Sequence, residues 1–157
     1  MGEEILYRPE RCILCHACEV ACAREHADQG AIWVVSRSGW GAAIACRHCE
    51  SAPCVAACPA GALERHNGRV DLQAGRCTGC ELCIWACPFG AVAFDAERKR
   101  AYKCDLCLDR QEAGRGPACV LTCPSQALVR ACVADFASRR RAVAGRAVAA
   151  GWERRGA

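Results

Sequence analysis

The stretch Cys77-Thr-Gly-Cys-Glu-Leu-Cys-Ile-Trp-Ala-Cys-Pro88 decides the fold of this chain. Its first three cysteines recur at every third position, so their thiolates can wrap around one face of a metal–sulfide cubane. The fourth, Cys87, is carried away by the intervening residues, and Pro88 then turns the chain. The spacing C-x2-C-x2-C-x3-C-P therefore predicts ligands for an iron–sulfur cluster.

The other cysteines extend this pattern over most of the chain. Seventeen of the 157 residues are cysteine, and all but Cys132 fall into four groups of four. Each group opens with C-x2-C and closes with C-x3-C; the middle gap is two residues in groups one and three, four in group two and eleven in group four. The groups are Cys12, Cys15, Cys18 and Cys22; Cys46, Cys49, Cys54 and Cys58; Cys77, Cys80, Cys83 and Cys87; and Cys104, Cys107, Cys119 and Cys123.

A second repeat, C-P-x-x-A-[LV], starts at the closing cysteine of groups two, three and four, whereas group one departs from it. Short strands are expected between the groups. Asn67-Gly68 is a strong turn signal between residues 62–65 and 69–72, and residues 91–94 can pair with residues 101–102. With a short helical turn before the closing cysteines, these features predict an α+β fold of short β-hairpins and short helices.

The apolar residues other than cysteine are mostly Ala and Val, which build a thin core, so the fold needs disulfides or metals to hold it. Met1-Gly2-Glu3-Glu4 is acidic where a signal peptide would be positive, and no apolar run is long enough to cross a membrane. We therefore expect a cytoplasmic protein without direct membrane insertion. Because a reducing cytoplasm disfavours disulfides, metal is the expected staple.

Structural zinc is the main alternative to iron–sulfur clusters. Zinc takes four ligands, usually from two C-x2-4-C pairs set well apart, and the tight runs of groups one and three do not match that habit. Group four is more open, because Cys104-x2-Cys107 and Cys119-x3-Cys123 would pass alone as a zinc loop. Because group four occurs beside three other cysteine groups, an iron–sulfur cluster is favoured over zinc for it as well.

Residues 9 to about 130 resemble the four-cluster ferredoxin-like electron-transfer subunits of molybdenum and tungsten oxidoreductases, such as dimethyl sulfoxide reductase, formate dehydrogenase and formate hydrogenlyase. The spacings of groups two and four match that family. With only 23 residues between Cys22 and Cys46, the chain is shorter than many members and resembles the small soluble partners of this family. Among these, we expect it to be most similar to the small iron–sulfur subunit of multi-subunit tungsten aldehyde oxidoreductases. The resemblance implies four [4Fe-4S] clusters in a non-catalytic subunit.

The resemblance also implies a crosswise pairing of the groups, whereas spacing alone leaves open a pairing of group one with two and of three with four. Two interlocked bacterial-ferredoxin-like modules would then fill residues 1–131, module one from 9–25 and 101–130 and module two from 43–100. Cys132 is not expected to be a ligand. The implied ligands are Cys12, Cys15, Cys18 and Cys123 for cluster A; Cys22, Cys104, Cys107 and Cys119 for cluster B; Cys46, Cys49, Cys54 and Cys87 for cluster C; and Cys58, Cys77, Cys80 and Cys83 for cluster D.

The formal net charge of +4 comes entirely from residues 132–157, which hold six arginines against two acidic residues. Four oxidised cubanes with their thiolates add about −8, so the loaded protein has an acidic body and a basic tail. Apolar residues from Val133 to Val148 fall on one stripe at helical spacing. We expect residues 132–157 to form a basic, helical tail for subunit docking, with a frayed terminus as the alternative.

These features predict a subunit that relays single electrons to or from a catalytic molybdenum or tungsten subunit. A further electron-acceptor subunit and copies of this chain are other candidate partners. The alternative is a free-standing polyferredoxin serving several redox enzymes; a structural zinc protein is a remote one. No Rossmann fingerprint, Walker loop or nucleophile–base pair is visible, which argues against catalysis. One arginine cluster without interleaved aromatic residues argues against nucleic acid binding.

Several residues outside the four cysteine groups could bind iron, tune a cluster or fill the core. His16 and His48 lie inside cysteine loops, but each group already has four thiols, so neither is expected to bind iron. Lys103, just before Cys104, either raises the potential of one cluster or is a solvated turn lysine. The side chains expected to shield clusters or fill the core are Trp33, Trp40 and Trp85.

Overall fold

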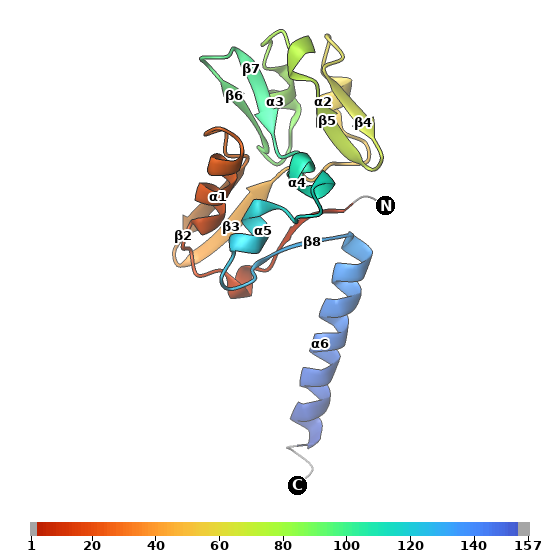
Figure 1. The fold of residues 1–157 in the computed structure, drawn as a ribbon. Coiled ribbons are helices and arrows are strands. Elements are labelled where there is room, and N and C mark those ends of the chain that lie inside the picture. The colour runs from red at the N-terminus through yellow and green to blue at the C-terminus, as the bar shows by residue number, and fades with distance from the viewer. Residues whose placement is uncertain (1–2, 154–157) are drawn as a thin grey trace.

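The structure, a computed structural model, describes residues 3–153 (Figure 1). Short strands and helices alternate along the chain until one long helix ends it. The strands are β1 (Glu4–Tyr7), β2 (Ile32–Arg37), β3 (Trp40–Ala45), β4 (Leu63–His66), β5 (Arg69–Leu72), β6 (Val92–Asp95), β7 (Arg100–Lys103) and β8 (Leu128–Ala131). The α-helices are α1 (Ala17–Glu25), α2 (Pro53–Ala56), α3 (Leu82–Ala86), α4 (Leu108–Glu112), α5 (Ala118–Thr122) and α6 (Val133–Glu153), and two 3-10 turns are η1 (Pro9–Arg11) and η2 (Ala74–Arg76).

The strands pair two by two, and all four pairs are antiparallel. Three pairs are local hairpins, β2–β3, β4–β5 and β6–β7, so the predicted α+β fold with short hairpins is confirmed. The β4–β5 turn is Asn67-Gly68, and both residues have positive φ (48° and 79°), as a tight hairpin turn requires. In the fourth pair, β1 lies beside β8, with Ile5 opposite Arg130, which ties the two ends of the body together.

The order of elements repeats once along the chain. The series β1, η1, α1, β2, β3, α2, β4 is followed by β5, η2, α3, β6, β7, α5, β8, with α4 added in the long middle gap of group four. Left-handed backbone recurs at matching places: Leu14 (φ 56°) corresponds to Gly79 (φ 74°), and His16 (φ 57°) to Glu81 (φ 61°). The body is therefore built from two halves of the same design.

The core is small and made of small side chains. It has two clusters of buried residues, one around Ile5, Ile32 and Leu128 and one around Leu63 and Val70, and both contain cysteines of the four groups. Most other buried side chains are Ala or Cys. So little apolar area is a weak driving force for folding, as the composition predicts.

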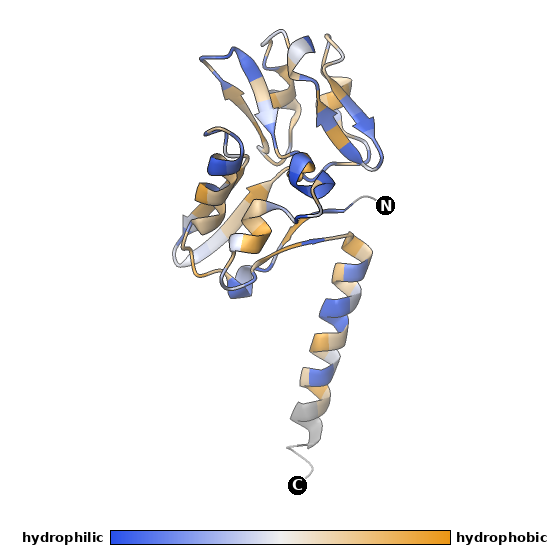
Figure 2. Cartoon of the chain, viewed as in Figure 1, coloured by the Kyte–Doolittle hydropathy of each residue, from blue (hydrophilic) through white to orange (hydrophobic). Residues whose placement is uncertain are grey.

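Helix α6 extends away from the body, and hydrophobic and hydrophilic residues alternate along it (Figures 1 and 2). Near its start Phe136 is partly buried, and the guanidinium carbons of Arg8 and Arg140 lie 5.5 Å and 5.9 Å from its ring centroid. Arg140 also forms an ion pair with Glu10 at 2.6 Å. The predicted tail helix is confirmed over residues 133–153, and residues 154–157 of the predicted tail lie outside the described residues. Among residues 3–153, no helix has both the length and the hydropathy needed to cross a membrane.

Candidate metal centres

All seventeen cysteines carry free thiols, so disulfides do not hold the described chain together. In every group the third cysteine lies in a short helix: Cys18 in α1, Cys54 in α2, Cys83 in α3 and Cys119 in α5. The fourth cysteine lies one turn later, at or near the end of that helix. The helix therefore separates the two thiols by a fixed distance and leaves the first two cysteines on a loop.

Left-handed residues bend these loops. Gly79 lies between Cys77 and Cys80 with φ of 74°, and a Cβ atom added there would come within 2.6 Å of the Lys99 carbonyl oxygen. The corresponding turns in groups two and four contain His48 (φ 45°) and Leu106 (φ 64°), residues that adopt this backbone at some cost. Such repeated strain is typical of loops that wrap around a ligand.

A backbone N–H donates to the thiol of each closing cysteine. The donor in groups two, three and four is the Ala of the C-P-x-x-A repeat, which explains that alanine in the sequence. In group one the donor comes later in the chain, from the residue that precedes β2. All four alanines are at most 4% exposed. The bonds are Ala31 to Cys22 (3.3 Å), Ala62 to Cys58 (3.3 Å), Ala91 to Cys87 (3.3 Å) and Ala127 to Cys123 (3.2 Å).

These N–H groups favour the thiolate. At Cys123 burial raises the pKa of the thiol, but N–H groups of Leu128, Ala127 and Ser125 and the Ser125 hydroxyl outweigh it, and the pKa falls below its usual value. Burial dominates at Cys104, where it raises the pKa to about 12. Because iron binds the thiolate, loading such a site releases protons.

The structure brings the closing cysteine of one group to the thiols of another. Cys123 lines one cavity together with Cys12, Cys15 and Cys18, the first three cysteines of group one. Burial and the neighbouring Cys104 and Cys22 raise the pKa of Cys119, so the closing cysteine of group one lies with group four. We name these cysteine set A (Cys12, Cys15, Cys18, Cys123) and set B (Cys22, Cys104, Cys107, Cys119).

In groups two and three, too, the closing cysteine of each group lies near thiols of the other group. After burial, Cys46 and Cys87 raise the pKa of Cys49, because a nearby thiolate disfavours a second negative charge. Burial, Cys77 and Cys58 likewise raise the pKa of Cys83 to about 11. Set C is Cys46, Cys49, Cys54 and Cys87; set D is Cys58, Cys77 and Cys83, with Cys80 on the same loop.

The four sets follow one another in a row. Cys18 of set A contributes to the raised pKa of Cys119 in set B. Cys46 of set C contributes to that of Cys104 in set B, and Cys54 of set C to that of Cys83 in set D. Neighbouring sets therefore feel each other's charge in the order A, B, C, D. At the two ends, Cys15 and Cys80 are exposed to solvent.

The buried Nε2 of His48 indicates whether a cluster fits beside set C. His48 is 4% exposed, and its Nδ1 accepts the N–H of Val70 at 3.0 Å, so the ring proton must be on Nε2. Burial and the charge of Lys103 lower the pKa of His48 to about 3, which keeps the ring neutral. Nε2 has no acceptor among the described residues. A sulfur of a cluster between Cys46 and Cys49 would supply one, so the site fits an iron–sulfur cubane.

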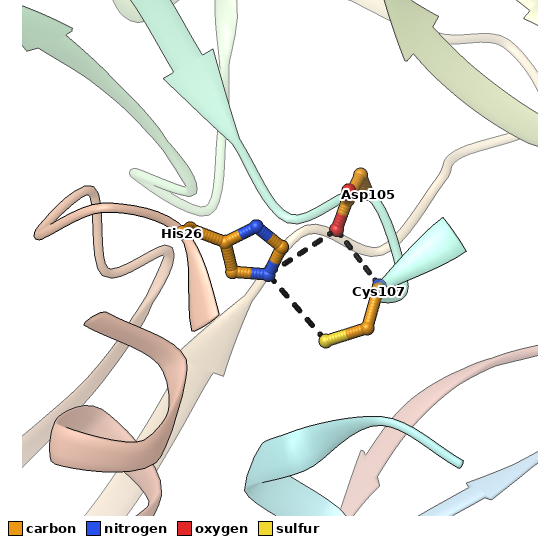
Figure 3. Close-up of side chains that lie close together, drawn as sticks. All are labelled: His26, Asp105 and Cys107. Atoms are coloured by element: carbon orange, nitrogen blue, oxygen red, sulfur yellow. Dashed lines mark hydrogen bonds and ion pairs between the residues drawn. The ribbon is translucent and has the colours of Figure 1, made fainter. Parts of the chain in front are cut away.

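A second histidine, His26, contacts set B, and sequence reasoning missed it (Figure 3). Its Nε2 lies 3.4 Å from Cys107 Sγ and 3.6 Å from Asp105 Oδ1. The same carboxylate oxygen accepts the N–H of Cys107 at 2.8 Å. The three ligand atoms could hold a single metal ion, but Cys107 is also surrounded by the other thiols of set B. The only signal in the sequence is the position of His26, one helical turn after Cys22.

Other expectations need correction. Trp40 is 73% and Trp85 85% exposed, so these two rings neither shield clusters nor fill the core, although Trp33 packs against it. Lys103 is 8% exposed, and the interpretation as a solvated turn lysine is therefore wrong. Cys132 is half-buried, and its Sγ accepts the N–H of Asp135 at 3.5 Å at the start of α6. His16 is exposed and pairs with Glu19.

Known proteins that are similar to this chain include iron–sulfur and electron-transfer proteins. The profile of the 4Fe-4S dicluster domain matches residues 40–132, which include groups two, three and four. The chain is 41% identical over 142 residues to the putative electron transport protein YsaA of Escherichia coli K12, covering 82% of this chain and 88% of YsaA. It is 35% identical over 156 residues to the electron transport protein HydN of the same organism (82% and 87% covered). It is 40% identical over 139 residues to the thiosulfate reductase electron transfer subunit PhsB of Salmonella typhi (79% and 72% covered).

Fold and thiol sets together define an iron–sulfur electron-transfer protein that carries four [4Fe-4S] clusters and is not itself a catalyst. The chain belongs to the 4Fe-4S dicluster domain family. When bound, each cubane takes up and releases one electron. The protein's own part is to present thiolates, to donate N–H groups to sulfur and to exclude water from the inner sets.

Proposed function

We propose that this chain relays single electrons along a row of four clusters, to or from a catalytic molybdenum or tungsten subunit. The observation that carries the proposal is the crosswise gathering of thiols into sets that follow one another in the order A, B, C, D. A single cluster would suffice for a structural staple. Four neighbouring redox centres, with exposed cysteines at both ends, suit transfer across the whole body.

The proposed ligands of clusters A, B, C and D are the cysteines of the sets with the same letters, with Cys80 as the fourth ligand of cluster D. In this assignment residues 9–25 and 101–130 form module one, and residues 43–100 form module two. The shared cavity around set A supports it, as do the mutual effects of the thiols on their pKa values in sets B and C. Cys132 is left without a cluster, and its thiol instead accepts an N–H at the start of α6.

The partner proposal rests on the relatives and on α6. PhsB is named as an electron transfer subunit of thiosulfate reductase, so it works beside a catalytic subunit. Helix α6 presents exposed Arg139, Arg140, Arg141 and Arg146, together with exposed Val143 and Val148. Between Arg139 and Ala147 it also lines a pocket together with Arg8, Glu10 and Arg11 of the body. Such a helix suits docking to an acidic surface with an apolar stripe. The alternative function, that of a polyferredoxin that diffuses between enzymes, does not require such a docking helix.

Metal analysis of the anaerobically purified protein tests the cofactor, and co-purification tests the partner. We expect about 16 iron and about 16 acid-labile sulfide per chain, and no stoichiometric zinc. A larger subunit with molybdenum or tungsten should co-elute in size-exclusion chromatography. Elution as a monomer from the native cytoplasm would favour the free polyferredoxin. Which of the two metals the partner holds tests the tungsten aldehyde oxidoreductase expectation, which stays a prediction, as does the cytoplasmic location.

A further inference from the structure

Lys103 is a buried cation between strand β5 and the first cysteine of group four. It is the last residue of β7 and is 8% exposed. Its Nζ donates to the carbonyl oxygen of Cys104 at 2.9 Å and to that of Val70 in β5. The N–H of Val70 in turn donates to His48 at 3.0 Å. Lys103 is thus held in place by the backbone of β5 and by that of Cys104, the residue that follows it.

The charge of Lys103 lacks a carboxylate partner. Among the residues whose side chains the structure describes, Lys103 makes no ion pair with Asp or Glu. The nearby carboxylate of Asp71 pairs with Arg69 at 2.6 Å. Burying an ammonium group away from water is costly unless a negative charge compensates it. Two carbonyl dipoles are weak compensation for a full charge.

The negative charge that compensates the Lys103 ammonium group comes from the thiolates and clusters of sets B and C. Lys103 directly precedes Cys104 of set B. It is also near set C, because its Nζ and the ring of His48, which lies between Cys46 and Cys49, both hydrogen-bond to Val70. Cys46 and Cys104 belong to one cluster of buried residues, so sets B and C meet here. An oxidised cubane with four thiolates carries about −2, and its reduced form about −3.

We propose that Lys103 is the built-in counter-charge of the two inner clusters, B and C, and raises the reduction potentials of both. This inference rests on the proposed function and its ligand sets. Reduction adds one electron to a cluster, and a fixed cation nearby in a low-dielectric surrounding favours the more negative state. Clusters A and D lie beyond the inner pair and feel the cation less. Lys103 therefore makes the middle of the row easier to reduce than its surroundings alone would allow.

The chain has two lysines, and variants of both test the proposal. Lys99 is the control, because it is exposed on the same β6–β7 hairpin. Potentials are measured by redox titration monitored by electron paramagnetic resonance. In K103M we expect two of the four clusters to lose about tenfold in the ratio of reduced to oxidised form at a fixed potential, which is about 59 mV for a one-electron couple. K103R, which keeps the charge, and K99M should titrate like the wild type. Unchanged or uniformly shifted potentials in K103M would overturn the proposal.

A second measurement covers the case in which K103M binds no iron. The wild-type holoprotein is treated with an amine acylating reagent, and the modified lysines are identified by mass spectrometry. Lys99 should react freely, and Lys103 should be protected at least tenfold until the clusters are removed. Equal reaction of both lysines in the holoprotein would contradict a buried counter-charge. If the wild type itself lacked iron and sulfide, the proposed function would fail instead, so the two failures are distinguishable.

Discussion

At the residue scale, the closing cysteines of all four groups share one feature, a backbone N–H that donates to the sulfur. Three of the four donors are fixed by the C-P-x-x-A turn, and the fourth is Ala31. The N–H groups lower the pKa of Cys58 and Cys123 against the opposing effect of burial. Stabilised as a thiolate in this way, the closing cysteine can bind a cluster together with cysteines of another group, and no long loop is needed to bring it there.

Cys123→Ser tests the crosswise assignment at one of these residues. Cys123 lines a cavity with Cys12, Cys15 and Cys18, so we expect the variant to lose or convert cluster A and to keep cluster B, with iron falling by one to four atoms per chain from about 16. Iron analysis and electron paramagnetic resonance measure this. Cys132→Ser is the matched control and should keep all iron. Loss of the cluster bound by Cys104, with cluster A intact, would show that the crosswise assignment is wrong.

His26 offers a test of tuning by a side chain. In the loaded protein Cys107 is a thiolate, which can only accept, so the contact with Cys107 Sγ at 3.4 Å is a hydrogen bond only when His26 Nε2 is the donor. A hydrogen bond to a ligand sulfur raises the potential of its cluster. We expect His26→Phe to lower the potential of one cluster, with about a tenfold loss of its reduced form at a fixed potential.

The control for this change is His66→Phe, because His66 is an exposed histidine of the β4–β5 hairpin. It should leave all four potentials as in the wild type. His26→Gln, which keeps an N–H donor, should restore part of the loss. A titration in which His26→Phe and His66→Phe cannot be told apart would remove His26 from any role in tuning.

At the element scale, local signals could be read from the sequence and distant pairings could not. The β4–β5 hairpin follows from Asn67-Gly68, and α6 from the apolar stripe of residues 133–148. The pairing of β1 with β8 leaves no local mark, because it depends on two segments at opposite ends of the body. The role of Ala31 was hidden for a similar reason: its thiol partner, Cys22, lies nine residues before it rather than four.

Gly79→Ala tests how closely a loop must follow its cluster. The φ of 74° and the Lys99 carbonyl 2.6 Å from the added Cβ both oppose a side chain. We expect a loss of about 1–3 kcal/mol in the free energy of unfolding and faster loss of iron from set D. Gly75→Ala is the control, since no heavy atom lies within 4 Å of its added Cβ and its φ is not positive. Anaerobic thermal unfolding followed by visible absorbance measures both, and equal melting temperatures would refute the expected strain.

At the scale of the whole molecule, charge and shape divide the protein into two parts. The body holds equal numbers of acidic and basic residues, and its four clusters add about −8, whereas the helix that follows is rich in arginine. The sequence could reveal the sixteen candidate ligands and this imbalance. It could not reveal His26, the buried position of Lys103 or the exposed Trp85, because burial depends on how the two halves meet.

The separation of body and helix leads to the last prediction. From Ser138 to Ala149 every side chain of α6 is exposed, so little of the body depends on that part of the helix. Replacing Arg139 and Arg141 by Glu should leave iron content, absorbance and potentials unchanged. If α6 docks to an acidic surface, the same change should weaken association with the catalytic subunit at least tenfold, and the wild-type association should fall as salt rises.

Arg37→Glu with Arg115→Glu gives the matched control, since it changes the net charge equally at exposed sites of the body. Co-expressed subunits are compared by size-exclusion chromatography with light scattering, and the metal of the large subunit is measured in each peak. Equal weakening by both pairs would mean that net charge, rather than α6, governs association. A wild-type chain that elutes as a monomer, with all its iron, would instead favour a free polyferredoxin, because it would hold its clusters without being bound to a catalytic subunit.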